Sequence, residues 1–105
     1  MPTFLITYHG DGGGMPASAE AREQMMAAFQ AWAASVADSM IDPGAPLGPA
    51  KAVTASGVSD GSADGRVSGY TLLSADSIDA AVGLVQGHPF LSRGGTLQVS
   101  QAVSP

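Results

Sequence analysis

Two hydrophobic periods alternate along the 105 residues of the chain, and their order constrains the fold more than any other feature. Over residues 3–8 apolar side chains recur at every second position, which predicts a strand. The face that we expect to be buried holds Phe4, Ile6 and Tyr8. The opposite face holds Leu5, Thr7 and His9.

From Ser18 the period lengthens to three and four residues, as on one face of a helix. This stripe comprises Met25, Phe29, Trp32, Val36 and Met40. We expect the helix to end by residues 42–44, because Pro43 disfavours helical geometry at the residue before it. At this spacing Phe29 and Trp32 are expected to pack in the core rather than to line a pocket for an aromatic ligand.

The second half of the chain continues with strand and helix patterns. Residues 51–56 predict a weak second strand and residues 66–74 a third, and the Asp-Gly pairs at 60–61 and 64–65 indicate a turn between them. A second helix is expected from Asp76, which can cap it, until Gly87 and Pro89 end it. Its predicted buried stripe comprises Ile78, Ala81, Val82 and Val85. Residues 96–103 alternate as a last strand.

The order strand–helix–strand–strand–helix–strand predicts one α+β domain over residues 1–105 with a ferredoxin-like βαββαβ fold. Such a fold has a four-stranded antiparallel sheet with two helices on one face. Two short helices leave the other face uncovered, and Asp, Glu, Lys and Arg make up only 12% of the chain. We therefore expect two copies to pair through their sheet faces, as a homodimer that forms an α/β barrel.

Charge and composition exclude several classes of protein. Nine acidic residues against four basic ones give a net charge of −5, which argues against a nucleic-acid partner. The chain contains no long apolar run and no basic segment followed by an apolar one, so we expect no membrane partner and a cytoplasmic location. The absence of Cys excludes disulfides, a thiolate nucleophile and a zinc finger.

Residues 68–81, Ser-Gly-Tyr-Thr-Leu-Leu-Ser-Ala-Asp-Ser-Ile-Asp-Ala-Ala, carry a family resemblance. They resemble the YCII-related family, in its DGPF-domain branch, where a strand with a small-Gly-aromatic opening leads to an acidic cap and a helix. Residues 88–90, His-Pro-Phe, stand where many members have Asp-Pro-Phe or Asp-Pro-Tyr, and residues 94–99 resemble the closing strand. The resemblance is close over the second half of the chain and looser upstream.

This resemblance implies a ferredoxin-like fold that dimerises through its sheets into an α/β barrel. The family includes a dehydrochlorinase that acts on a chlorinated hydroxyhydroquinone, and members that occur beside or fused to alternative sigma factors. Its acid–base dyad pairs a His on the first helix with the Asp of Asp-Pro-Phe/Tyr. In an ungapped match these positions hold Met25 and His88. Both depart from the dyad, so the resemblance does not carry the reaction to this chain.

The topology places the two histidines at the same end of the predicted sheet. The first strand ends at His9, and the last strand, antiparallel to it, begins just after His88. Imidazole titrates near neutrality and suits proton transfer, so His9 and His88 are the candidate catalytic pair. Asp11 and Arg93 are the candidate ligand-binding residues beside them. The alternative places His9 at a dimer interface and His88 at a helix C-terminus.

No metal or cofactor is expected. Both histidines with Asp11 would reach the number of ligands that a metal needs, but no typical ligand spacing supports such a site. The string Gly-Val-Ser-Asp-Gly at 57–61 and the glycine run at 10–14 resemble hydrolase motifs only as strings, because the chain is too short for those folds. Both predict turns, although free backbone N–H groups in the glycine run could hold a small anion.

Three functions stay open on these grounds. The first is a dimeric protein that binds a small aromatic or anionic molecule in a cleft near His9 and His88. The second is an enzyme of the dehydrochlorinase or isomerase type that uses both histidines for acid–base chemistry. The third is a regulatory or structural dimer without a ligand.

Overall fold

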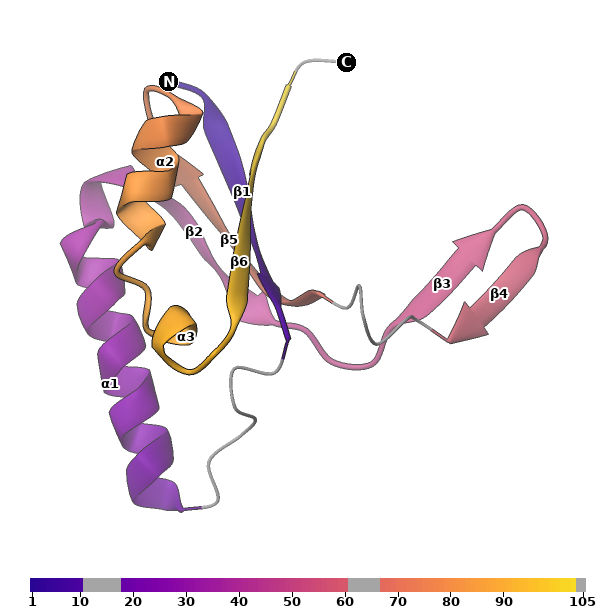
Figure 1. Cartoon of the computed structure of the whole chain (residues 1–105), viewed down its shortest axis with the longest axis horizontal. Helices are drawn as coiled ribbons and strands as arrows, with labels where there is room; N and C mark the ends of the chain where they lie inside the picture. The colour runs from indigo at the N-terminus through magenta and orange to yellow at the C-terminus, as the bar shows by residue number, and fades with distance from the viewer. Residues whose placement is uncertain (11–17, 61–66, 104–105) are drawn as a thin grey trace.

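A computed structural model describes residues 1–10, 18–60 and 67–103 (Figure 1). Its main sheet contains β1 (Thr3–His9), β2 (Met40–Pro46), β5 (Val67–Ser74) and β6 (Thr96–Gln101). A second, two-stranded sheet contains β3 (Lys51–Thr54) and β4 (Gly57–Asp60). The helices are α1 (Ala19–Ser35), the 3-10 turn η1 (Ala37–Ser39), α2 (Ile78–Val85) and α3 (Pro89–Ser92).

The strands of the main sheet run in the order β2-β5-β1-β6, and every neighbouring pair is antiparallel. Figure 1 shows α1, α2 and α3 on one side of this sheet and no helix on the other. This is the predicted α+β, ferredoxin-like arrangement, with the two-stranded sheet inserted between its second and third strands. None of the described helices is long and apolar enough to cross a membrane.

Serine residues cap the two longer helices. The Ser18 hydroxyl accepts a hydrogen bond from the Ala21 N–H at the start of α1 (3.1 Å). The Ser77 hydroxyl does the same for the Ala80 N–H in α2 (3.1 Å). The predicted cap at Asp76 is wrong by one residue, because Ser77 has the extended backbone that an N-cap requires.

The core lies between the sheet and the helices, and its strand side follows the predicted alternation. Phe4, Ile6 and Leu73 are completely buried, whereas Leu5 on the other face is 36% exposed. Trp32 of α1 and Val36, which caps the C-terminus of that helix, pack on these side chains. In α2 only half of the predicted stripe is buried: Ala81 and Val85 face the core, and Ile78 and Val82 are exposed. A helix of eight residues presents too few turns to cover the sheet with a wider stripe.

The second strand of the sheet is residues 40–46, not residues 51–56 as the sequence predicts. Met40, expected in the helix stripe, begins this strand, and Pro43 and Pro46 lie within it. Proline is tolerated here because β2 is an edge strand whose register against β5 shifts twice. The sequence predicts that the helix ends by this Pro-Gly segment, but α1 already ends at Ser35, and η1 and the first residues of β2 precede Pro43.

The backbone conformation and close packing of β2 at residue 44 require glycine. Its φ is +75°, and a Cβ placed on it would lie 1.7 Å from the Tyr70 carbonyl oxygen. We expect Gly44→Ala to lower the free energy of unfolding by about 2 kcal/mol, since the edge strand must retreat from β5. Gly48→Ala is the matched control, because a Cβ there meets nothing within 4 Å. Urea unfolding at one chain concentration measures both, and equal losses would contradict the register described for β2.

Residues 51–54 pair instead with residues 57–60, with Val53 opposite Val58 and Lys51 opposite Asp60. The turn is at residues 55–56, and Gly57 follows it with a φ of +141°. The predicted pairing of residues 51–56 with residues 66–74 is therefore wrong. The two Asp-Gly pairs are predicted to form the turn. Only Asp60 of these four residues is described, since residues 61–66 lie outside the described part of the chain. In Figure 1 this hairpin projects from the body on the side away from the helices.

Candidate functional site

His88 lies at the junction between α2 and α3. Its backbone N–H donates to the Val85 carbonyl at the end of α2 (3.0 Å). Its ring then caps the next helix: Nδ1 accepts a hydrogen bond from the Phe90 N–H (3.0 Å), with Pro89 at the first helical position. The side chain is thus an N-cap of α3 and not the α2 C-terminal residue considered from the sequence. A backbone N–H can only donate, so Nδ1 carries no proton.

A chain of hydrogen bonds runs from this ring across the sheet to the edge strand. His88 Nε2 lies 2.7 Å from the Tyr8 hydroxyl, which lies 2.8 Å from Thr71 Oγ1. Thr71 Oγ1 in turn donates to the Pro43 carbonyl (3.0 Å). The donors and acceptors at the two ends of the chain determine the direction of each hydrogen bond. Because Thr71 donates to a carbonyl, it accepts from the Tyr8 hydroxyl, and Tyr8 in turn accepts from the His88 Nε2–H. His88 is consequently the neutral Nε2–H tautomer, and both of its nitrogens are engaged.

Aromatic rings surround the His88 imidazole, which is 3% exposed. The ring centroid of Trp32 is 4.3 Å away, that of Tyr8 5.0 Å and that of Phe29 5.6 Å. Burial and, to a smaller extent, the positive charge of Arg93 together lower the pKa of His88 to about 4. Burial also raises the pKa of the Tyr8 phenol, against a smaller opposite effect of its hydrogen bond to Thr71. Both groups are therefore uncharged near neutral pH.

A cavity of about 430 Å³ adjoins this network, within the size range of small-molecule sites. Apolar side chains dominate its lining, with Met25, Met26 and Phe29 from α1 and Phe90 from α3. Residues 43–46 of the edge strand form another wall. Tyr8 and His88 supply polar side chains, and among the described residues of the lining Arg93 is the charged one.

Arg93 occupies the C-terminal cap position of α3, where its guanidinium lies 5.7 Å from the centroid of the Phe90 ring. This distance is within the range of cation–π contact. The side chain is half-buried. Arg93 thus brings a positive charge to a cavity lined mainly by apolar groups.

The structure brings some of the predicted site residues together and separates others. His88 and Arg93 line the same cavity, as does Met25, which the family resemblance matches to the dyad His. His9 lies at the same end of the sheet but on the opposite face, where its Nε2 is 2.8 Å from Thr7 Oγ1. Side chains alternate along a strand, so Tyr8 faces the helices and His9 faces away. Asp11 lies outside the described residues.

Tyr8 and Thr71 are functional candidates that sequence reasoning missed. The signal for Tyr8 was its place in the alternating face of Phe4 and Ile6, where a hydroxyl must find a partner. Thr71 is completely buried, and its position on the core face of β5 gave no comparable signal. Phe29, expected in the core, is half-buried and lines the cavity, whereas Trp32 is buried as predicted.

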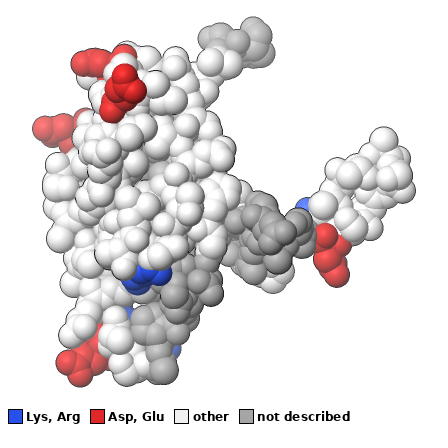
Figure 2. Space-filling view, viewed as in Figure 1, with Lys and Arg blue, Asp and Glu red and all other residues white. Residues whose placement is uncertain are grey.

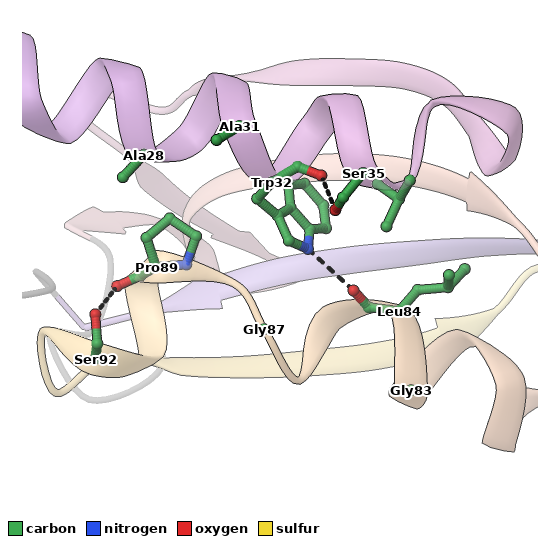
Figure 3. Close-up of a pocket in the computed structure, with 10 residues that line it drawn as sticks. Ala28, Ala31, Trp32, Ser35, Gly83, Leu84, Gly87, Pro89 and Ser92 are labelled. Carbon is green, nitrogen blue, oxygen red and sulfur yellow. Dashed lines mark hydrogen bonds between the residues drawn. The ribbon is translucent and has the colours of Figure 1, made fainter.

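A second, more open hollow lies between α1, α2 and α3 (Figure 3). Among the residues that the structure describes, its lining contains no titratable side chain and many small residues, such as Ala28, Ala31 and Gly83. Figure 3 shows the Trp32 indole pointing from α1 toward α2, where its Nε1–H donates to the Leu84 carbonyl (3.0 Å). This hydrogen bond fixes the indole that packs on His88, so the hollow is bounded by a structural contact. In the described segments, no three His, Asp or Glu side chains gather as metal ligands would.

No protein-family model and no curated protein sequence matches the chain. Among solved structures, the chain is similar to the 5-chloro-2-hydroxyhydroquinone dehydrochlorinase TftG from Burkholderia phenoliruptrix AC1100, in complex with 2,5-dihydroxybenzoquinone. The two chains are 24% identical, with a TM-score of 0.48, over 91% of this chain and 90% of that one. A likeness at this level carries no functional role from that enzyme to the present chain.

Proposed function

We propose that the protein binds a small aromatic molecule with an anionic group in the cavity beside His88. The observation that carries this proposal is the combination of an apolar, partly aromatic lining with the positive charge of Arg93. Aromatic and methionine side chains favour a flat apolar ligand. A guanidinium at the same cavity favours a carboxylate or phenolate on that ligand.

The hydrogen-bond network supports binding over proton transfer. A general base needs a lone pair that can reach the substrate near neutral pH. His88 uses Nδ1 to accept from Phe90 and Nε2–H to donate to Tyr8, and burial keeps the Tyr8 phenol protonated. His9, on the other face of the sheet, does not reach this cavity's lining. His88 in this proposal is a positioning residue that orders the cavity wall.

We also propose that two copies pair through the uncovered sheet face. Along β1, β5 and β6 the residues on this face include Leu5, Thr7, His9, Tyr70, Leu72, Ser74, Thr96, Gln98 and Ser100, by the alternation and register of the strands. None of these nine is Asp, Glu, Lys or Arg. Leu5 is opposite Leu72 in the register, so apolar side chains meet near the middle of the face. These three strands form an uncharged surface with an apolar centre, which is suited to pairing with its own copy, and the carboxylate of Asp42 lies beside it on the edge strand β2, in register with Leu72.

A matched pair of probes tests the binding proposal. We expect 1-naphthoate to raise the melting temperature and 1-naphthamide, its neutral analogue, to raise it less. Arg93→Gln should weaken naphthoate binding about ten-fold, equivalent to about 1.4 kcal/mol, and should leave naphthamide binding unchanged. Arg22→Gln, which removes the same charge from α1 outside this cavity, is the control. Equal binding of the acid and the amide, or equal losses in both variants, would contradict an anion site at Arg93.

A further inference from the structure

The hairpin of residues 51–60, here called the arm, is not part of the body, which is the four-stranded sheet with its helices. Its strands pair only with each other, and every residue of β3 and β4 except Ala52 is exposed. The arm makes the molecule unusually extended: the radius of gyration is 15.0 Å, against about 13 Å for a compact domain of this length.

Little within the chain stabilises this hairpin. An isolated two-stranded hairpin is marginal in water. The Lys51–Asp60 ion pair lies between two exposed side chains, and such pairs contribute little. On the same face Val53 stands opposite Val58, and these side chains are 75% and 68% exposed. A valine pair held out in water on a marginal hairpin indicates a surface that another molecule covers.

The arm and the uncovered sheet face border the same space. In Figure 1 the arm extends on the side of the sheet opposite the helices. A second copy paired across that face would therefore lie next to the arm of the first. Two-fold symmetry would place the second arm beside the first body in the same way.

We infer that each arm packs its Val53–Val58 face against a second copy of the chain and completes the dimer. This inference rests on the proposed sheet pairing. Strand spacing and rise give the sheet face roughly 450 Å² per copy, about half of the roughly 800 Å² per partner of a stable interface. One face of the hairpin adds roughly 150 Å². Because each copy both gives and receives an arm, the interface then approaches the usual size.

The charge distribution favours a second copy as the occupant over a charged partner. The chain has a net charge of −5, so two copies repel unless they meet on uncharged surfaces. On the face that Figure 2 shows, the visible acidic side chains of the body lie at its upper end, its lower end and its helix side. The nine positions of β1, β5 and β6 named above carry no charge, and in the arm the charges of Lys51 and Asp60 cancel.

Sedimentation equilibrium of the full chain tests the inference between about 1 and 100 μM. We expect Val53→Thr/Val58→Thr, which keeps shape and strand propensity, to raise the dimer dissociation constant at least ten-fold. Val53→Asp/Val58→Asp should raise it further. Thr54→Asp/Ser59→Asp is the control, because it adds two acids on the opposite face of the arm and should change the constant less than three-fold. Circular dichroism of each variant verifies that the body stays folded.

The possible outcomes distinguish a failure of the arm contact from a failure of the sheet pairing on which it rests. A wild-type chain that stays monomeric throughout this range would overturn both the sheet pairing and the arm contact. A wild-type dimer that neither valine variant weakens would leave the sheet pairing standing and overturn the arm contact alone. Naphthoate binding to the monomeric variants would show that the cavity is independent of the arm.

Discussion

Between about pH 6.5 and pH 4 the free energy of unfolding is expected to fall by about 2–3 kcal/mol because of His88 alone. An unfolded His takes up a proton below about pH 6.5, whereas the pKa of His88 in the folded chain is about 4. In this window the unfolded state therefore binds one more proton, and acid favours unfolding. The contribution is complete above pH 6.5 and is lost as the pH falls toward 4.

His88→Asn isolates this effect. The Asn side chain can still cap α3 by accepting from the Phe90 N–H, but it cannot titrate or reach Tyr8. We expect the variant to be less stable than wild type at pH 7, and the two stability curves to converge as the pH approaches 4. His9→Asn removes the other imidazole from the opposite sheet face and should keep the wild-type profile. Urea unfolding at each pH, at one chain concentration, measures all three. Parallel curves for wild type and His88→Asn would refute the assignment of a buried, neutral His88.

Replacing Trp32 by alanine should cost about 3–5 kcal/mol of unfolding free energy. The indole is buried, lies against His88 and donates to the Leu84 carbonyl, so its removal leaves a cavity and an acceptor without its donor. Because the ring also excludes water from His88, the pKa of His88 should rise toward its ordinary value. Chemical denaturation measures the first effect, and the NMR titration of the His88 ring protons measures the second.

One further variant separates the hydrogen bond of Trp32 from its packing, and a second variant in α1 is the control. Trp32→Phe keeps an aromatic ring but removes the Nε1–H donor, and should lose about 1–2 kcal/mol. Met26→Ala lies on the exposed side of the same helix, at 59% exposure, and should change stability by less than about 0.5 kcal/mol. If Trp32→Ala were as mild as Met26→Ala, the packing of α1 on His88 would be wrong.

The cavity depends partly on the local alternation of side chains, which the sequence shows, and partly on contacts between distant segments, which it does not. The residues at its wall come from β1, α1, β2, β5 and α3, and no single stretch of sequence contains the network. Alternation in the first strand correctly placed Tyr8 on the helix face and His9 on the other. That same alternation separates His9 from His88, although their shared end of the sheet suggested a pair. The roles of His88 and Arg93 in ligand binding remain predictions that the Arg93→Gln experiment and the pH profiles address.

By itself the sequence determined the βαββαβ order, the buried faces of β1 and α1, and the absence of charge from most of the open sheet face. These features follow from short periods, because the spacing of neighbouring side chains decides which of them meet the core. Only the tertiary structure decided that residues 40–46 form the second strand, since an edge position tolerates the prolines that elsewhere end a strand. It also decided the path from His88 through Tyr8 and Thr71 to Pro43, because hydrogen bonds between distant segments depend on strand register and helix docking, which no local period encodes.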